Sequence, residues 1–252
     1  MNRLIKSEFY RIRRSSHFTM WILMVTFLTF AVPVIAISLT CMENKYNVAN
    51  FVQCYMANSG TLTFMLVSML AATVAVMPYN YKTSNYMVIT GNSIHKILIS
   101  NMVTLLVSII LPLMVAFAAL TGIFYAMGGM GDISGNELVK KWVLVFIGLA
   151  HLIIVSGMIS GVVRHIVAVG AVLVRWELVD IILPMVLYLW LGDKSKVAAD
   201  SYNWMVSTVF TNEELAFSTV DSKLIIYQLL ALVIEVALWY VVLCVKHRKR
   251  NY

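Results

Sequence analysis

Long apolar runs separated by short polar stretches dominate the chain. A helix rises about 1.5 Å per residue, so about 20 apolar residues cross a hydrocarbon core of about 30 Å. Six runs reach that length, at 18–39, 60–78, 97–126, 138–163, 166–191 and 224–245. The pattern predicts an all-α, polytopic membrane protein, with six transmembrane helices in a single domain over residues 1–252.

The composition favours bilayer over water as the surrounding solvent. Hydrophobic residues make up 61% of the 252 residues and charged residues only 12%. A soluble domain is about half apolar and about a quarter charged, so too few polar residues remain here to cover a water-facing surface. The N-terminal run is not expected to be a cleavable signal, because its basic region is long and no small-residue cleavage site follows it.

Basic residues are divided unevenly between the two sides that six spans create. One side would hold both termini, the 79–96 loop and the 164–165 turn, with twelve Lys or Arg residues and one acid. The other side would hold six Lys or Arg residues and eight acids. The positive-inside rule places the first side in the cytoplasm. Both termini are therefore predicted to be cytoplasmic, and the 192–223 segment extracellular.

The first seventeen residues are predicted to contain an amphipathic elbow helix. In LIKSEFYRIRR, Ile5, Phe9 and Ile12 recur at helical spacing, and basic residues fall on the other faces. Such a helix lies in the inner membrane interface before the chain turns into the first span. The alternative is a basic flank that only orients that span.

A charged stretch interrupts the fifth predicted span. VLVRWELVDIIL at 172–183 contains Arg175, Glu177 and Asp180. A charge at the bilayer centre costs about 2.5–3.5 kcal/mol on insertion scales, so these side chains need partners. Glu177 and Asp180 are three residues apart and share a helical face, whereas Arg175 is expected to point elsewhere.

Glu235 in the sixth predicted span is the expected partner of Arg175, because the two residues lie at similar depths in antiparallel neighbours. This pairing would leave Glu177 and Asp180 facing an aqueous or inter-subunit cavity. The alternative is a fifth span that is broken at the charged stretch, with Pro184 kinking the remainder.

Other polar or small residues within the spans indicate packing. His151, in the middle of the fourth span, is expected to be a hydrogen-bonded packing residue. Gly157 and Gly161 form a G-x-x-x-G pattern, which favours close helix packing or a dimer seam. Cys41 and Cys54 share a predicted outer loop, either as a disulfide or as free thiols, and no metal-site spacing occurs.

Motifs of enzymes and nucleotide sites are missing from the sequence. It contains no G-x-x-x-x-G-K-[ST] phosphate loop, no H-E-x-x-H and no G-x-S-x-G. Catalysis is therefore not expected, no metal or cofactor site is predicted, and nucleic acid is not an expected partner. Uphill transport would take its energy from another subunit or from an ion gradient.

The 79–96 segment joins the second and third predicted spans on the cytoplasmic side. In NYKTSNYMVITGNSIHKILIS, from residue 80, a polar and then a mixed stretch precede a turn at 91–93 and a basic entry into the next span. Ser93 is the expected N-cap of that span. A short exposed helix followed by a turn suits docking onto a soluble partner, and a simple solvated connection is the alternative.

Two stretches resemble permease subunits of type-2 ATP-binding-cassette (ABC) exporters, particularly the small antimicrobial-peptide export and immunity permeases of Gram-positive bacteria. KSEFYRIRR at 6–14 is similar to their basic, aromatic N-terminal stretch, and Lys82 and SIHKILIS at 93–100 match their cytoplasmic coupling loop. Asn80 and Ser84–Asn85 differ from that pattern. The resemblance implies an ATPase-coupling loop made by Lys82, Thr83, Ser84, Asn85, Tyr86, Gly91, Asn92 and Ser93.

The resemblance further implies a bacterial plasma-membrane permease that pairs with a second copy, or with a similar permease, and with two ATPase subunits. Those subunits would bind the ATP and Mg. The expected substrate is an amphipathic antimicrobial or toxin-like peptide, exported for delivery or for bacteriocin immunity. Alternatives are lipid or drug export, an ion-coupled carrier or channel without an ATPase, and a membrane anchor that transports nothing.

Overall fold

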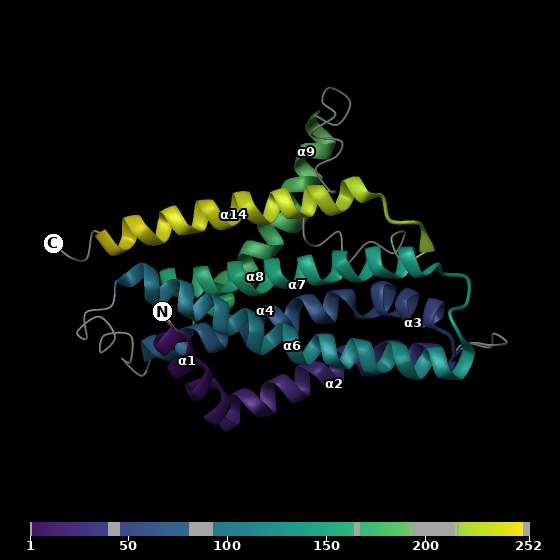
Figure 1. Ribbon diagram of the computed structural model, residues 1–252. Coiled ribbons are helices and arrows are strands. Elements are labelled where there is room, and N and C mark those ends of the chain that lie inside the picture. The colour runs from purple at the N-terminus through teal and green to yellow at the C-terminus, as the bar shows by residue number, and fades with distance from the viewer. Residues whose placement is uncertain are drawn as a thin grey trace.

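The computed structural model describes residues 2–39, 46–80, 93–163, 167–191, 194, 215 and 217–248. All regular structure within these ranges is helical, as the apolar pattern predicts (Figure 1). The helices are α1 (Asn2–Arg14), α2 (Ser16–Leu39), α3 (Val48–Cys54), η1 (Tyr55–Ser59), α4 (Gly60–Asn80), α6 (Ile94–Gly128), α7 (Gly135–Val163), α8 (Ala168–Trp176), η2 (Glu177–Ile182), α9 (Leu183–Leu191) and α14 (Ser222–Arg248). The two η elements are π-helical.

Four helical stretches are long and apolar enough to cross a membrane, and such stretches are typical of membrane proteins. They are Phe18–Leu39, His95–Gly128, Gly135–Val163 and Ser222–Lys246. A fifth candidate arises if Val48–Ala57 and Leu62–Met77 are counted as one span bent by 67°. The predicted span at 166–191 is divided among α8, η2 and α9, each of which is shorter than a span.

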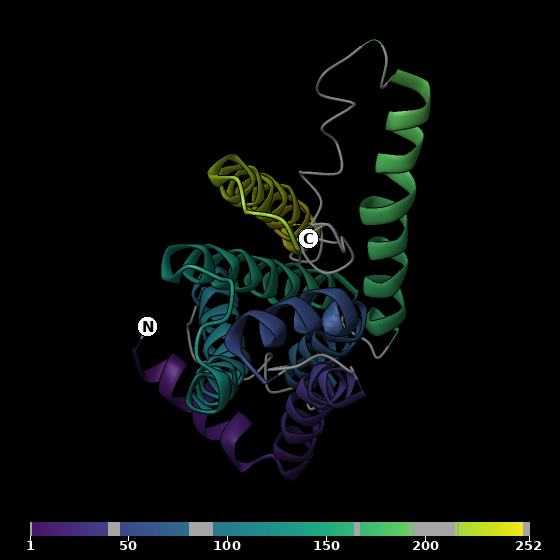
Figure 2. The same ribbon diagram turned by 90° about the vertical axis from the view of Figure 1, so that its right-hand side faces the viewer.

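Helix α7 lies in the middle of the bundle (Figures 1 and 2). It packs against α4, α6, α8 and α14. Gly157 permits the close approach of α6, because a Cβ atom at this position would lie 3.0 Å from Met102 Sδ and 3.3 Å from Leu105 Cδ1. The close helix packing expected of Gly157 is therefore present within the chain, and Gly161, one turn later, is buried as well.

Helices α7 and α14 run in the same direction. Three contacts join α7 to α14 and to the residues just before it. Val220 N–H, two residues before α14, donates to Glu137 Oε1, His151 Nε2 bonds Glu235 Oε2, and Lys246 Nζ donates to the Val162 carbonyl. The paired residues are 83, 84 and 84 positions apart, and a near-constant offset is the signature of parallel helices. The chain between α7 and α14 therefore returns to the end of the bundle at which α7 begins.

The first and last described helices approach the same end of the bundle (Figure 1). Helix α1 packs against α6, and the Tyr240 hydroxyl of α14 lies 2.6 Å from His95 Nδ1 near the start of α6. Ile12 of α1 is buried, as is Glu8, which accepts from Arg11 Nε at 2.9 Å. A helix is thus present at the predicted position, and its apolar face is packed.

Two short helices, α3 and η1, occupy a segment that the sequence predicted to be a loop. Asn47 begins α3, and its Oδ1 accepts from Asn50 N–H at 2.8 Å. Phe51 of α3 is fully buried. VANFVQC is much shorter than a membrane span, so a search for apolar runs of span length does not find it. Cys54 therefore lies in α3 and not in a loop, and Cys41 lies outside the described residues.

An aromatic cluster fills the core between α2, η1, α6 and α7. Phe117 of α6 is at its centre and is buried. Its ring centroid lies 4.5 Å from Tyr55, 5.1 Å from Trp142 and 5.2 Å from Phe30. Edge-to-face geometry at all three contacts makes this residue a packing hub that joins four elements.

Ser93 begins α6 in the manner that the sequence predicts. Its backbone is extended, and its Oγ accepts from Lys96 N–H at 3.4 Å. The other residues of the predicted coupling loop lie outside the described residues, as does most of the 192–223 segment. These loop residues are Lys82, Thr83, Ser84, Asn85, Tyr86, Gly91 and Asn92.

Candidate functional site

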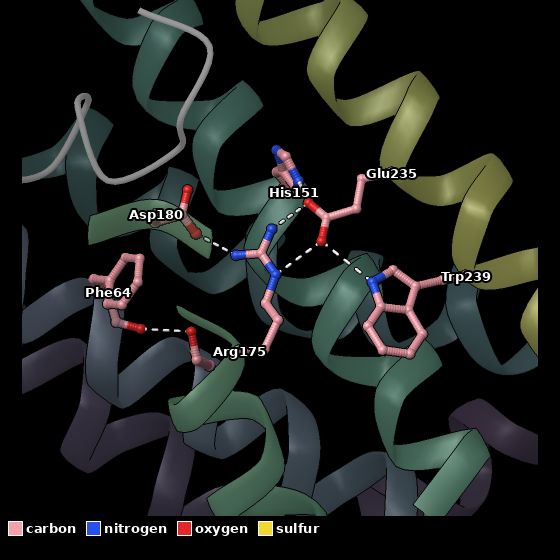
Figure 3. Close-up of polar contacts among 7 residues, drawn as sticks. Phe64, His151, Arg175, Asp180, Glu235 and Trp239 are labelled. Atoms are coloured by element: carbon pink, nitrogen blue, oxygen red, sulfur yellow. Dashed lines mark hydrogen bonds and ion pairs between the residues drawn. The ribbon is translucent and has the colours of Figure 1, made fainter. Parts of the chain in front are cut away.

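Arg175 is the centre of a buried ion cluster where α8, η2, α7 and α14 meet (Figure 3). Its Nε donates to Glu235 Oε1 at 2.8 Å, and its Nη2 pairs with Glu235 Oε2. Its Nη1 pairs with Asp180 Oδ2. The planar guanidinium thus holds one carboxylate with two parallel hydrogen bonds and a second carboxylate with its remaining nitrogen. The contact between Arg175 and Glu235 that equal depth predicts is confirmed.

The pairing of Arg175 with Asp180 was not expected from the sequence. In an α-helix residues five apart lie on different faces, and on that basis Arg175 was predicted to point away from Asp180. That prediction is wrong, because Asp180 lies in the π-helical segment η2. A π-helix bonds residues five apart and so brings them onto one face. The Leu183 N–H shows this spacing, since it donates to the Leu178 carbonyl.

The fifth predicted span is therefore neither a regular α-helix nor a broken one. Helical structure is continuous from α8 through η2 to α9. Pro184, the second residue of α9, has no N–H to donate to the preceding turn, which disfavours regular α-helical bonding here. Beyond this point α9 projects away from the bundle (Figures 1 and 2). The side chain of Glu177, at the start of η2, is not among those that the structure describes.

The Glu235 carboxylate receives four donors. Besides the two nitrogens of Arg175, His151 Nε2 lies 2.6 Å from Oε2, and Trp239 Nε1 donates to Oε1 at 3.2 Å. An ionised carboxylate only accepts, so the hydrogen is assigned to Nε2 of the His151 ring. The Nδ1 atom of that ring is buried, and no described residue bonds it.

Trp176 supports the guanidinium from one side. The Arg175 Cζ lies 3.4 Å from the Trp176 ring centroid. The same ring packs edge-on against Phe64 of α4 at 5.2 Å and against His151 at 6.0 Å. A guanidinium stacked on an aromatic ring and shielded from water is both attracted to the ring and fixed in orientation.

The ionisable side chains of the cluster are largely shielded from water. The side chains of His151, Arg175 and Asp180 are 2%, 7% and 1% exposed, and that of Glu235 is 17% exposed. A buried charge is costly unless it is paired. The Arg175 guanidinium is paired with both carboxylates, those of Asp180 and Glu235.

A cavity of about 540 Å³ adjoins the cluster between α7, η2, α9 and α14. This volume lies within the range of about 300–1,000 Å³ that is usual for small-molecule sites. Asp180 lines it, whereas Glu177, which the sequence predicts to face an aqueous or inter-subunit cavity together with Asp180, is not among the side chains that the structure describes. The lining consists of His151, Arg175, Val179, Asp180, Leu183, Ala231, Ile234, Glu235, Leu238, Trp239 and Val242.

The sequence analysis did not place Trp239 or His151 beside Glu235. Trp239 follows Glu235 by four residues, and this helical spacing places both side chains on one face. His151 is a hydrogen-bonded packing residue, as predicted, but its partner was unknown. Because α7 and α14 are parallel, residues at similar distances from their first residues lie at similar depths. Counting residues from the starts of the two helices would therefore have placed His151 near Glu235.

Within the described ranges, no group of three or more His, Cys, Asp or Glu side chains is positioned to hold a metal ion. Comparisons with protein-family models, with curated proteins and with solved structures find no match. Function therefore has to follow from the residues of this chain and their geometry.

Proposed function

We propose that this chain is the membrane-spanning permease subunit of an ATP-driven exporter of the type-2 ABC class. The observation that carries the proposal is the arrangement at one end of the bundle, where the amphipathic helix α1 packs against α6. Helix α6 follows directly on the segment that resembles a coupling loop. An elbow helix and a coupling loop would therefore meet on the same face of the membrane, where ATPase subunits dock.

The charge distribution supports a cytoplasmic position for this end. Arg13 and Arg14 are exposed at the end of α1, Lys96 is exposed at the start of α6, and Lys246 lies near the end of α14. The positive-inside rule favours the cytoplasm for such a basic end. The parallel course of α7 and α14 requires the chain to recross between them, which supports six spans with both termini in the cytoplasm.

In the proposed mechanism the partner ATPases bind ATP and Mg, and this chain transmits their motion. Helix α6 has 35 residues, which corresponds to a length of about 52 Å. It is longer than a hydrocarbon core of about 30 Å, so one element reaches from the coupling loop across the membrane. A second copy or a similar permease would complete the pathway, and an amphipathic peptide or lipid-like substrate would leave through it.

Purification from native membranes in a mild detergent tests this proposal. The tagged chain is expected to retain an ATPase subunit, detected by mass spectrometry and by ATP hydrolysis in the eluate. Replacing residues 82–92 with a Gly-Ser linker of equal length is expected to abolish retention. The same replacement at 129–134, in the turn between α6 and α7, is the matched control and should not affect it. An intact chain that never retains an ATPase would refute the proposal.

An ion-coupled carrier is the second candidate, and the buried cluster around Arg175 favours it. Intramembrane ionisable groups that are buried and paired with one another occur in proton and cation relays. The two candidates differ in what the chain does alone. Purified chain in liposomes, given an ion gradient and no ATPase, is expected to transport nothing if it is an exporter subunit. Gradient-driven uptake by the chain alone would favour the carrier.

A further inference from the structure

We propose that the outer face of α1 binds the head groups of anionic phospholipids in the leaflet beside the basic end of the bundle. This face consists of Lys6, Tyr10, Arg13 and Arg14, all of which are exposed. Binding of lipid is independent of the exporter proposal and is tested without an ATPase.

The four side chains share one side of α1. They recur at i, i+4, i+7 and i+8, which is the spacing of a single helical face. Ile12 lies on the opposite side and is buried, and α1 packs against α6 and α2. The apolar side of α1 is therefore covered by protein, while the helix itself lies at the edge of the bundle (Figure 2). Its basic side is left to contact the surroundings.

The charge of this outer face is entirely positive. Glu8 is the acid of α1, and it is 1% exposed and accepts from Arg11 Nε at 2.9 Å. Glu8 and Arg11 thus neutralise one another within the protein. No acid among the residues that the structure describes pairs with Lys6, Arg13 or Arg14. Clustered cations of this kind are attracted to a negatively charged lipid surface.

Tyr10 positions one of these cations. Its hydroxyl accepts from Arg14 Nη1, and the Arg14 Cζ lies 5.5 Å from the centre of the Tyr10 ring. A guanidinium presents its donors in a planar fork that matches phosphate oxygens, and a guanidinium that is already positioned loses less freedom on binding. Tyrosine is enriched at membrane–water interfaces, so a ring that is 61% exposed suits the level of the head groups.

The position of α1 along the chain favours lipid over a soluble partner. Helix α2 begins at Ser16, and its stretch that is able to span a membrane begins at Phe18. Arg14 precedes Phe18 by four residues, which corresponds to about 6 Å along a helix. The polar layer on each side of the hydrocarbon core is about 5–8 Å thick, so Arg14 is placed at head-group level. Met20 and Leu23 of α2 are 71% and 65% exposed and suit the acyl chains next to this level.

Two lipids with the same acyl chains test the class of ligand. Phosphatidylglycerol carries a net negative charge, whereas phosphatidylcholine has a phosphate but no net charge. Binding of each to the purified full chain in mild detergent is measured by native mass spectrometry over a lipid titration. Phosphatidylglycerol is expected to bind at least tenfold more tightly, a difference of about 1.4 kcal/mol. Equal affinities would overturn the proposal.

Paired double variants test the location of the site. Arg13→Gln/Arg14→Gln removes two charges from the outer face of α1, so the affinity for phosphatidylglycerol is expected to fall at least tenfold. Lys194→Gln/Lys223→Gln is the matched control, because it removes two exposed charges from other parts of the chain and should bind like the wild type. Arg13→Lys/Arg14→Lys keeps the charge and is expected to stay within threefold of the wild-type affinity.

The outcomes of this comparison separate the face of α1 from net charge and from ATPase docking. Equal losses of affinity in the two glutamine variants would mean that lipid binding follows net charge alone, and would overturn the proposal. Wild-type affinity in Arg13→Gln/Arg14→Gln would also overturn it, and loss of ATPase retention in the same variant would then assign the face to the ATPase. If that variant does not fold, the comparison of the two lipids decides. ATPase retention by the wild type is measured separately, so a failure of the exporter proposal is distinguished from a failure of lipid binding.

Discussion

Arg175 and Asp180 form an ion pair although they are five positions apart on one continuous helical segment. The π-helical turn η2 makes this contact geometrically possible, and Pro184 limits regular bonding directly after it. Arg175 also holds Glu235 of α14, so one guanidinium links the local geometry of the fifth predicted span to the last helix. Two buried carboxylates thus share the Arg175 guanidinium, so substitutions at different members of the cluster are expected to differ in their effects.

Arg175→Gln is expected to be the most damaging single change in the cluster. It removes the guanidinium that two buried carboxylates share, and removing one partner of a buried ion pair costs about 3–5 kcal/mol. Glu235→Gln is expected to cost less, because it leaves one guanidinium with one carboxylate. The double variant Arg175→Gln/Glu235→Gln should lie between them, since only one carboxylate, that of Asp180, then loses the guanidinium. Melting temperatures in mild detergent, read from fluorescence-detected size exclusion, give this order.

Arg13→Gln provides the control for these variants, because Arg13 is exposed at the end of α1 and its loss should shift the melting temperature little. The expected order of stabilities would be contradicted if the Arg175→Gln variant melted at the same temperature as the Glu235→Gln variant. It would be contradicted equally by a double variant less stable than Arg175→Gln.

Gly157 is expected to tolerate alanine but not leucine. An added Cβ would meet the flexible end of Met102 at 3.0 Å, and this side chain is able to shift. The larger leucine would also press on Leu105 and force α6 away from α7, and such overpacking costs about 1–3 kcal/mol. Gly122→Leu is the matched control, because nothing lies within 4 Å of a Cβ at that position. The melting temperature should fall for Gly157→Leu alone, and an equal fall in both variants would refute this account of the packing.

Phe117→Ala is expected to destabilise the bundle strongly. The ring contacts aromatic side chains from three other elements, and truncating a buried phenylalanine costs about 3–5 kcal/mol. Phe27→Ala on α2 is the control, since Phe27 is 70% exposed. The same melting assay compares them, and a Phe117 variant as stable as the Phe27 variant would show that the cluster contributes little.

The sequence predicts some parts of this fold well and others poorly, for physical reasons. Apolar runs longer than a bilayer locate α2, α6, α7 and α14, because length and hydropathy are properties of the chain itself. The pairing of Arg175 with Glu235 follows from depth, which is also a count along the chain. The pairing of Arg175 with Asp180 does not follow, because it depends on a local change from α- to π-helical bonding. Helix α3 was missed because burial of its face comes from tertiary packing.

The orientation of the termini gives the last prediction. Single cysteines are introduced by Arg13→Cys, Asp132→Cys and Arg248→Cys into a chain whose three native cysteines have been replaced. Arg13 and Arg248 belong to the basic end, and Asp132 lies in the turn at the opposite end, between α6 and α7.

A membrane-impermeant maleimide should label intact cells at position 132 only, and should label positions 13 and 248 after permeabilisation. The positive-inside rule fixes the side of position 13. The parallel course of α7 and α14 fixes position 248 relative to it, because the end of α14 lies beside the end of α7. Labelling of position 248 but not position 13 in intact cells would mean an odd number of crossings. That result would rule out six spans and would place the basic end of α14 beyond the reach of a cytoplasmic ATPase.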